Sequence, residues 1–90
     1  MASDPISLMQ ARYALALLKL AQRMEPATAI ALVGNMLTDP PLREVTSEGA
    51  RLHAKALDSY NSLADALQGY QRPPWRAAID ATEQWIAGVS

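Results

Sequence analysis

An uncharged stretch near the middle of the chain, residues 26–38, constrains the fold more than any other feature. Its sequence is PATAIALVGNMLT, and it lies between Glu25 and Asp39 in a chain of which 19% of residues are charged. As a helix it is apolar on nearly every side, so neighbouring helices or a second copy of the chain must cover it. It is too short to cross a bilayer, which takes about 20 residues. The stretch therefore predicts a buried central helix.

The composition is typical of a single small helical domain over residues 1–90. Half of the residues are hydrophobic, with two Trp, three Tyr and no Phe, and Ala and Leu, which favour helices, are abundant. The chain has no cysteine, so it offers no disulfide and no thiolate metal site. Its net charge of −1 removes the general attraction on which nucleic-acid and anionic-membrane binders rely. No segment resembles a signal peptide or a membrane span, which predicts a cytoplasmic protein without membrane contact.

The first helix is predicted over residues 5–24 and carries two apolar stripes. Asp4 before Pro5 favours a helix start because a carboxylate accepts the free amide hydrogens of the first turn. One stripe recurs at steps of three and four and is assigned to the core; it comprises Ile6, Met9, Tyr13, Leu17, Leu20 and Met24. The other lies nearly opposite and needs a partner, most simply a symmetry-related copy; it comprises Leu8, Ala11, Leu15 and Leu18.

A helical hairpin followed by a long helix is the predicted centre of the fold. Residues 26–38 would fold back on the first helix with almost no loop. A third helix over residues 40–69 is predicted from apolar residues that keep one helical phase; they are Leu42, Val45, Gly49, Leu52, Ala56, Tyr60, Leu63, Leu67 and Tyr70. An alternative start with Ser47 as a new cap stays open, because the polar and small residues around it weaken the first turns.

A short closing helix is predicted over residues 74–87, with Gly88 ending it. Its apolar residues lie on one face; they are Trp75, Ala78, Ile79, Thr82, Trp85, Ile86 and Val89. The predicted fold class is therefore all-α: a small four-helix bundle built on an antiparallel helical hairpin.

One histidine and scattered carboxylates give little support to catalysis. His53 is the only histidine, so neither a catalytic triad nor a two-histidine metal site can form within one chain. A di-iron bundle needs Glu-x-x-His motifs, and none occurs. Two carboxylate pairs, Glu44 with Glu48 and Asp80 with Glu83, are expected to be solvated. We therefore expect no enzyme, no metal and no cofactor, and His53 is the one candidate ligand if a cofactor binds.

Helix packing is the function that these residues favour. The predicted interface joins the second stripe of the first helix to the tryptophan that opens the last helix: Leu8, Ala11, Leu15, Leu18 and Trp75. Trp75 is close in sequence to Arg72 and Arg76, and this combination is typical of interface hot spots. We expect a non-enzymatic adaptor, assembly chaperone or small structural subunit. Its protein partner is most simply a second copy of the chain, forming a homo-oligomer.

A pattern of large, small and terminating residues runs through residues 10–43, at Tyr13, Leu17, Leu20, Ala29, Val33, Met36 and Pro41. This pattern resembles a single tetratricopeptide repeat. The small residue that the repeat has at Leu17 and the glycine between its helices are missing, and no second repeat follows Glu44. For that reason we do not assign the chain to the family. The resemblance implies a surface that cradles a partner helix or peptide.

Two other functions stay open. Symmetry could gather copies of His53 around an axis, which predicts haem or another apolar ligand held between helices or subunits. Residues 43–55, with the helix before them, are similar in outline to a helix-turn-helix that binds DNA. The connection is long and rich in proline for that motif, and Glu44 and Glu48 would face phosphate, so nucleic acid is the less favoured partner.

Overall fold

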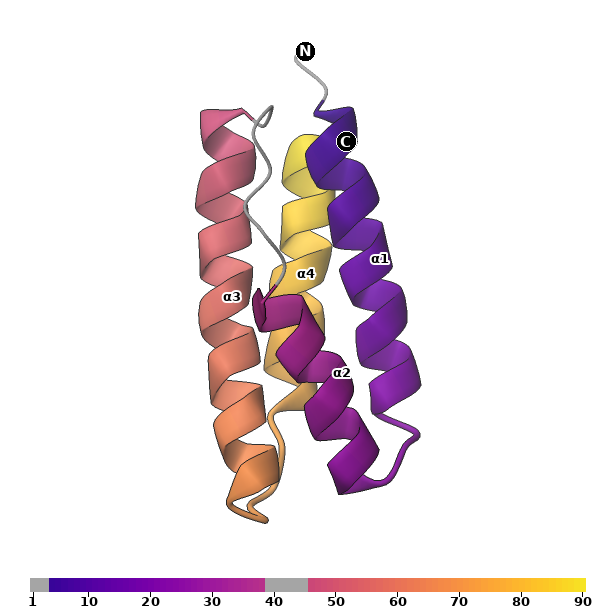
Figure 1. Ribbon diagram of the computed structural model, residues 1–90. Coiled ribbons are helices and arrows are strands. Elements are labelled where there is room, and N and C mark those ends of the chain that lie inside the picture. The colour runs from indigo at the N-terminus through magenta and orange to yellow at the C-terminus, as the bar shows by residue number, and fades with distance from the viewer. Residues whose placement is uncertain (1–3, 39–45) are drawn as a thin grey trace.

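Four antiparallel helices form the protein in a computed structural model that describes residues 4–38 and 46–90. They are α1 (Pro5–Ala21), α2 (Pro26–Thr38), α3 (Ser47–Gln68) and α4 (Trp75–Val89). The chain runs down α1, up the shorter α2, down the long α3 and up α4 (Figure 1). The part of the chain that the structure describes contains no strand. The predicted all-α four-helix bundle is confirmed.

Neighbouring helices follow the order α1, α4, α3, α2 around the bundle. α1 also touches α3 across the centre, whereas α2 and α4 lie diagonally apart. The prediction that α2 is a central helix is therefore wrong. It buries one face, formed by Ala29, Val33 and Met36, and it exposes Ala27 and Ala31. An outer position is tolerated because alanine exposes little apolar area when it faces water.

α1 turns a different face inward from the one predicted. Its buried residues follow steps of four and three and are mostly small: Ser7, Ala11, Ala14, Leu18 and Ala21. The residues assigned to the core instead face solvent at Met9, Tyr13 and Leu20. The volume of the neighbouring core side chains explains which face of α1 turns inward. Two large aromatic side chains, Trp85 and Tyr60, are buried in the core, so the helix packed beside them presents small side chains.

Trp85 and Tyr60 are each 1% exposed. Two hydrogen bonds in series hold the hydroxyl of Tyr60 in place. The Thr82 hydroxyl donates to the backbone carbonyl of Ala78 at 2.8 Å. The Tyr60 hydroxyl therefore donates to Thr82 Oγ1, at 2.5 Å, and so joins α3 to α4. Burial raises the pKa of Tyr60 to about 12, although the hydrogen bond with Thr82 acts in the opposite direction.

Tyr60→Phe is expected to lower the free energy of unfolding at neutral pH by about 1 kcal/mol, because one buried hydrogen bond is lost while Thr82 keeps its bond to Ala78. The wild-type protein should also lose stability between pH 10 and pH 12. Over that range the unfolded state ionises this tyrosine and the folded state does not. Urea titrations at neutral and alkaline pH measure both effects. The assignment fails if the two proteins lose stability equally as the pH rises through this range.

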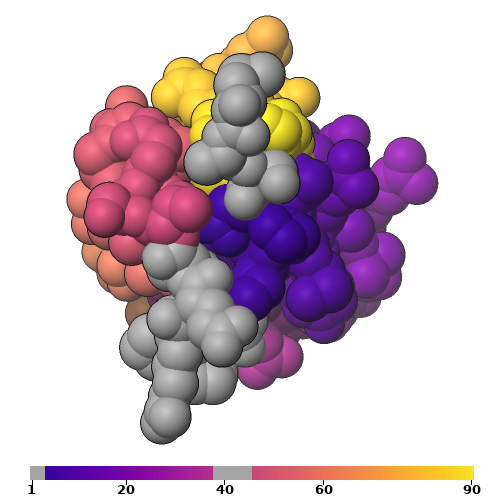
Figure 2. Space-filling model, turned by 90° about the horizontal axis from the view of Figure 1, so that it is seen from above, coloured from indigo at the N-terminus to yellow at the C-terminus, as the bar shows by residue number. Residues whose placement is uncertain are grey.

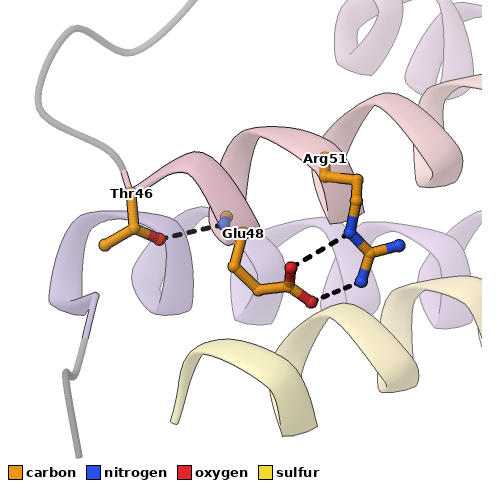
Figure 3. Close-up of polar contacts among 4 residues, drawn as sticks. Thr46, Glu48 and Arg51 are labelled. Atoms are coloured by element: carbon orange, nitrogen blue, oxygen red, sulfur yellow. Dashed lines mark hydrogen bonds and ion pairs between the residues drawn. The ribbon is translucent and has the colours of Figure 1, made fainter.

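The end of α1 and the start of α3 differ from prediction. α1 ends at Ala21 rather than Met24, and residues 22–25 form the turn into α2. α3 begins at Ser47, so the alternative start is confirmed, although its cap is Thr46 rather than Ser47. The Thr46 hydroxyl accepts a hydrogen bond from the backbone N–H of Gly49 at 2.9 Å (Figure 3). The predicted first residues of this helix, 40–45, lie outside the described residues, while the bounds of α2 agree with those predicted.

The ends of α3 and α4 correct two further predictions. Tyr70, assigned to the buried stripe of α3, is 90% exposed, because it follows the end of the helix and has left the helical phase. It takes a left-handed conformation with φ of 55°, and Gln71 N–H closes the turn on the carbonyl of Ala66 at 2.9 Å. Gly88 does not end α4, which continues to Val89. A Cβ at Gly88 would clash with Leu52 of α3, so this glycine allows the two helices to approach closely.

One end of the bundle is organised by Asp4, where the start of α1, the start of α3 and the end of α4 lie together (Figure 2). The Asp4 side chain is buried, and its backbone N–H donates to the carbonyl of Val89 at 3.2 Å. Its carboxylate accepts from Ser7 N at 3.0 Å and from Ser7 Oγ at 2.8 Å, which confirms the predicted cap of α1. It also accepts from the backbone N and from Oγ1 of Thr46, both at 2.9 Å.

Gly49 completes this group of residues, because a side chain at its position would enter the space that the polar atoms occupy. We name Asp4, Ser7, Thr46 and Gly49 the Asp4 cluster. One carboxylate thus caps α1 and, through Thr46, holds the cap of α3, which fixes the two helices relative to each other.

Candidate interaction surface

A line of apolar side chains lies on the outer surface of α1. Four large residues are exposed: Met9 by 69%, Tyr13 by 61%, Leu20 by 45% and, in the turn after the helix, Met24 by 42%. Ile6 and Leu17 are half-buried along the same line. We name these six residues the α1 stripe. Their exposed apolar area is on the order of 400 Å², which is the size of the largest patches on monomeric proteins, and such patches are often functional.

The α1 stripe lies on the flank of α1 that faces α2. At about 100° per residue, its centre is roughly 120° from the centre of the buried face. The opposite flank approaches α4, because Gln22 lines a surface groove together with Ile79 and Glu83 of that helix. At the start of α1, Ile6, Met9 and Tyr13 line a second, shallow groove that is almost wholly apolar.

α2 adds an uncharged surface beside the stripe. The helix contains no ionisable residue, and the residues that it exposes include Ala27, Thr28 and Ala31. α2 packs beside the second half of α1 and slants away from it toward α3 along its length (Figure 1). Small side chains let a further helix approach closely, since the distance between helix axes depends on the side chains at the contact. Large side chains on α1 and small ones on α2 together suit a helix laid along the pair.

Three cations lie along the other edge of the stripe. Arg12 and Lys19 of α1 and Arg23 of the turn after it are exposed. The helical positions of Arg12 and Lys19 are roughly 100–120° from the centre of the stripe, on the side away from α2. No acidic residue occurs within α1 itself. None of the three cations forms an ion pair with an acidic residue in the described ranges. The outer surface of α1 is therefore apolar on the side of α2 and basic on the other.

The residues predicted as an interface are divided by the structure. Ala11 and Leu18 have no exposed surface, so in this fold they are core residues rather than contacts for a partner. The physical reason is that Ala11 and Leu18 belong to the face of α1 that turns inward. Leu8 and Trp75 are half-buried against the core, and Leu15 is half-buried as well. These three stay predicted contacts.

His53 lies half-buried on α3 and stacks on Trp85, with ring centroids 4.8 Å apart and planes at 24°. In residues 4–38 and 46–90, no group of three or more His, Cys, Asp or Glu side chains is placed to hold a metal ion. The buried indole N–H of Trp85 has no hydrogen-bond acceptor among the described residues, so packing holds the ring. The proposal that His53 binds haem stays a prediction.

The remaining charged candidates face solvent. Glu48 pairs with Arg51 one turn later on α3, and both side chains are more than half exposed (Figure 3). The hydrogen bond from Arg51 lowers the pKa of Glu48. Asp80 and Glu83 are exposed on α4, as predicted. Glu44 and most of the connection needed for the helix-turn-helix lie outside the described residues, so DNA binding stays a prediction.

The stripe was visible in the sequence, but its outward orientation was not recognised. The signal for the outward orientation of the stripe is a series of small residues on another face of the helix. They recur at steps of four, three and seven and are Ser7, Ala11, Ala14 and Ala21. A seam of small residues favours close helix packing even where a neighbouring stripe is more hydrophobic.

Comparison with known proteins identifies no relative. No family model matches the chain, so none supports the resemblance of residues 10–43 to a tetratricopeptide repeat, and no curated protein or solved structure matches it either. A membrane span is not found among the described helices, none of which is long and apolar enough to form one.

Proposed function

We propose that this protein is a non-enzymatic interaction module that docks a helix of another polypeptide along the α1 stripe. The observation that carries the proposal is the exposure of Met9, Tyr13, Leu20 and Met24 on one outer line of the bundle. Covering a large apolar side chain is worth about 1.5–3 kcal/mol when burial is complete. A partner that covers the stripe therefore gains binding energy that the isolated chain does not use.

The spacing of the stripe favours a helix as the docked element. Its residues recur at steps of three and four, which is the pattern by which an amphipathic helix binds in a groove. From Ile6 to Leu20 the stripe is about 21 Å long, or about four helical turns. An adaptor, an assembly chaperone and a small structural subunit all act through such a contact, and a homo-oligomer is its symmetric form.

A photo-crosslinking amino acid at position 13 tests the proposal in the native cell. We expect a discrete adduct with one protein, because Tyr13 lies at the centre of the stripe and is 61% exposed. The matched control places the same amino acid at position 70, since Tyr70 is also an exposed tyrosine but lies outside the stripe. Mass spectrometry of the adduct identifies the partner.

The same experiment includes a variant with Met9→Ser and Leu20→Ser. Both positions are exposed, so the folded protein should lose less than about 1 kcal/mol of stability. The adduct formed from position 13 should fall about tenfold, because burial of two large side chains at the contact is lost. Adducts that are equally abundant from positions 13 and 70, or that persist in this variant, would rule out the stripe as the docking surface.

A further inference from the structure

We infer that the helix docked on the α1 stripe belongs to a different protein and is acidic along one edge, with Asp or Glu residues beside its apolar face. The inference rests on the proposed function and adds the chemistry of the partner. It follows from the charges that border the stripe. Arg12, Lys19 and Arg23 lie on one edge, and the other edge has the uncharged α2, which the exposed Glu25 precedes.

The cations are placed to contact a docked helix. Arg12 and Lys19 lie seven residues, or about two turns, apart along α1, and Arg23 follows in the turn after the helix, so the three follow the same direction as the stripe. All three are exposed, and no acid in the described ranges pairs with them. An anion at each position would gain a charge-assisted contact at the rim of an apolar interface, where complementary charges fix register and partner choice.

A second copy of the chain fits these charges poorly. In an antiparallel symmetric pair, the two-fold axis lies in the contact plane and sets the basic edge of one copy against the basic edge of the other. In a parallel pair, each basic edge meets the uncharged α2 of the other copy. In neither arrangement does α1 or α2 of the other copy supply an anion to these cations, because neither helix contains Asp or Glu. The antiparallel arrangement also adds repulsion.

An anionic membrane fits less well than an acidic helix. Lipid-binding surfaces usually gather about four to eight Lys or Arg residues, or add a second anchoring signal. α1 and the turn after it offer three cations, the inner face of the helix is committed to the core, and the whole chain has a net charge of −1. A single complementary helix can satisfy three cations in a row, because its own turns repeat at the same spacing.

Two synthetic peptides provide the test. Each is a capped amphipathic helix of about 18 residues with the same leucines at steps of three and four. One carries glutamates along one edge of the apolar face, and the other carries lysines at the same positions. Fluorescence anisotropy at low salt should show the glutamate peptide binding the wild-type protein about tenfold more tightly, and the difference should shrink as salt is added.

Charge reversal of the protein sharpens the test. Arg12→Glu, Lys19→Glu and Arg23→Glu together should reverse the preference, so that the lysine peptide binds more tightly. A control with the same change in net charge, Arg51→Glu, Lys55→Glu and Arg72→Glu, alters exposed cations on α3 and in the turn after it. This control should leave the preference for the glutamate peptide in place, apart from a small general effect of net charge.

Each other outcome overturns the inference. Equal binding of the two peptides that is lost with Met9→Ser and Leu20→Ser would leave the docking function standing and remove the acidic partner. Binding of neither peptide also removes it, and the crosslinking experiment then decides the proposed function independently. A dimer in sedimentation equilibrium that these serine variants dissociate would assign the stripe to a second copy. Binding to phosphatidylserine vesicles that the charge-reversed protein loses, without a peptide preference, would assign the cations to a membrane.

Discussion

Replacing Gly49 with alanine is expected to destabilise the protein by about 2–4 kcal/mol, a large share of the total for a domain of this size. A Cβ at this position would clash with Asp4 Oδ2 and lie 2.6 Å from Ser7 Oγ and 3.1 Å from Thr46 Oγ1. Those oxygens cannot move away without breaking the hydrogen bonds that join α1 to α3. The cost of overpacking and the cost of lost hydrogen bonds therefore add.

Gly34 in α2 provides a matched control for this substitution. A Cβ there would meet nothing within 4 Å, and alanine is favoured over glycine inside a helix by about 0.5–1 kcal/mol. Gly34→Ala should therefore leave the protein unchanged or slightly more stable. Urea denaturation followed by circular dichroism compares the two variants with the wild type. If Gly49→Ala proves as stable as Gly34→Ala, the close approach of α1 and α3 at the Asp4 cluster is refuted.

Asp4→Asn is expected to lower the free energy of unfolding by about 2–3 kcal/mol at neutral pH. This is the second large effect that the Asp4 cluster predicts. Asparagine has the same size as aspartate and can still cap α1. Asp4 Oδ2, however, accepts hydrogen bonds from three donors: Ser7 Oγ at 2.8 Å, and the backbone N and Oγ1 of Thr46, both at 2.9 Å. If asparagine places its amide nitrogen where Oδ2 lies, that donor faces three other donors. If the amide flips, its oxygen takes that place, but the Ser7 N–H loses its acceptor.

The same carboxylate gives the protein a defined acid sensitivity. Burial alone would raise the pKa of Asp4, but the hydrogen bonds from Thr46 and Ser7 outweigh it and lower the pKa to about 2, from 3.8. Because the folded value is the lower one, the unfolded state binds the proton first as the pH falls. The stabilisation is complete above about pH 5 and is lost progressively as the pH falls through 3.8 to 2, by about 1–2 kcal/mol after allowance for solvent screening.

Urea titrations from neutral pH to about pH 2 measure this loss. Asp4→Asn should remove this part of the acid sensitivity. Asp58→Asn replaces an exposed aspartate on α3 and serves as the control, with wild-type stability expected at neutral pH. An Asp4→Asn protein whose stability falls with pH as steeply as that of the wild type would show that Asp4 is not the group responsible.

The Asp4 cluster also matters for the candidate interaction surface. Ile6 and Met9 lie in the first turns of α1, directly after the cap that Asp4 provides. A helix whose first amide hydrogens lose their acceptor frays at that end. The position of the groove at the start of the α1 stripe therefore depends on a hydrogen-bonded group that lies at the end of the bundle.

Helix positions were predictable where a local chemical signal marks them. Asp4 with Pro5 starts α1 and Pro26 starts α2, because a cap and a proline act through neighbouring backbone atoms. The prediction that Gly88 ends α4 was wrong because the role of this glycine depends on a residue that is distant in sequence. Glycine often ends a helix, but here it makes room for Leu52, which lies 36 residues earlier on another helix. No local pattern distinguishes those two roles.

By itself, the sequence determined that this chain forms four helices without a strand in the described residues, and that α1 carries more apolar surface than one bundle face requires. Only the tertiary structure decided which face of α1 turns inward. Periodicity reports that a side chain is apolar, but not how much room its neighbours leave. With Trp85 and Tyr60 buried in the core, the small residues of α1 pack inside and Met9 and Tyr13 are left on the surface.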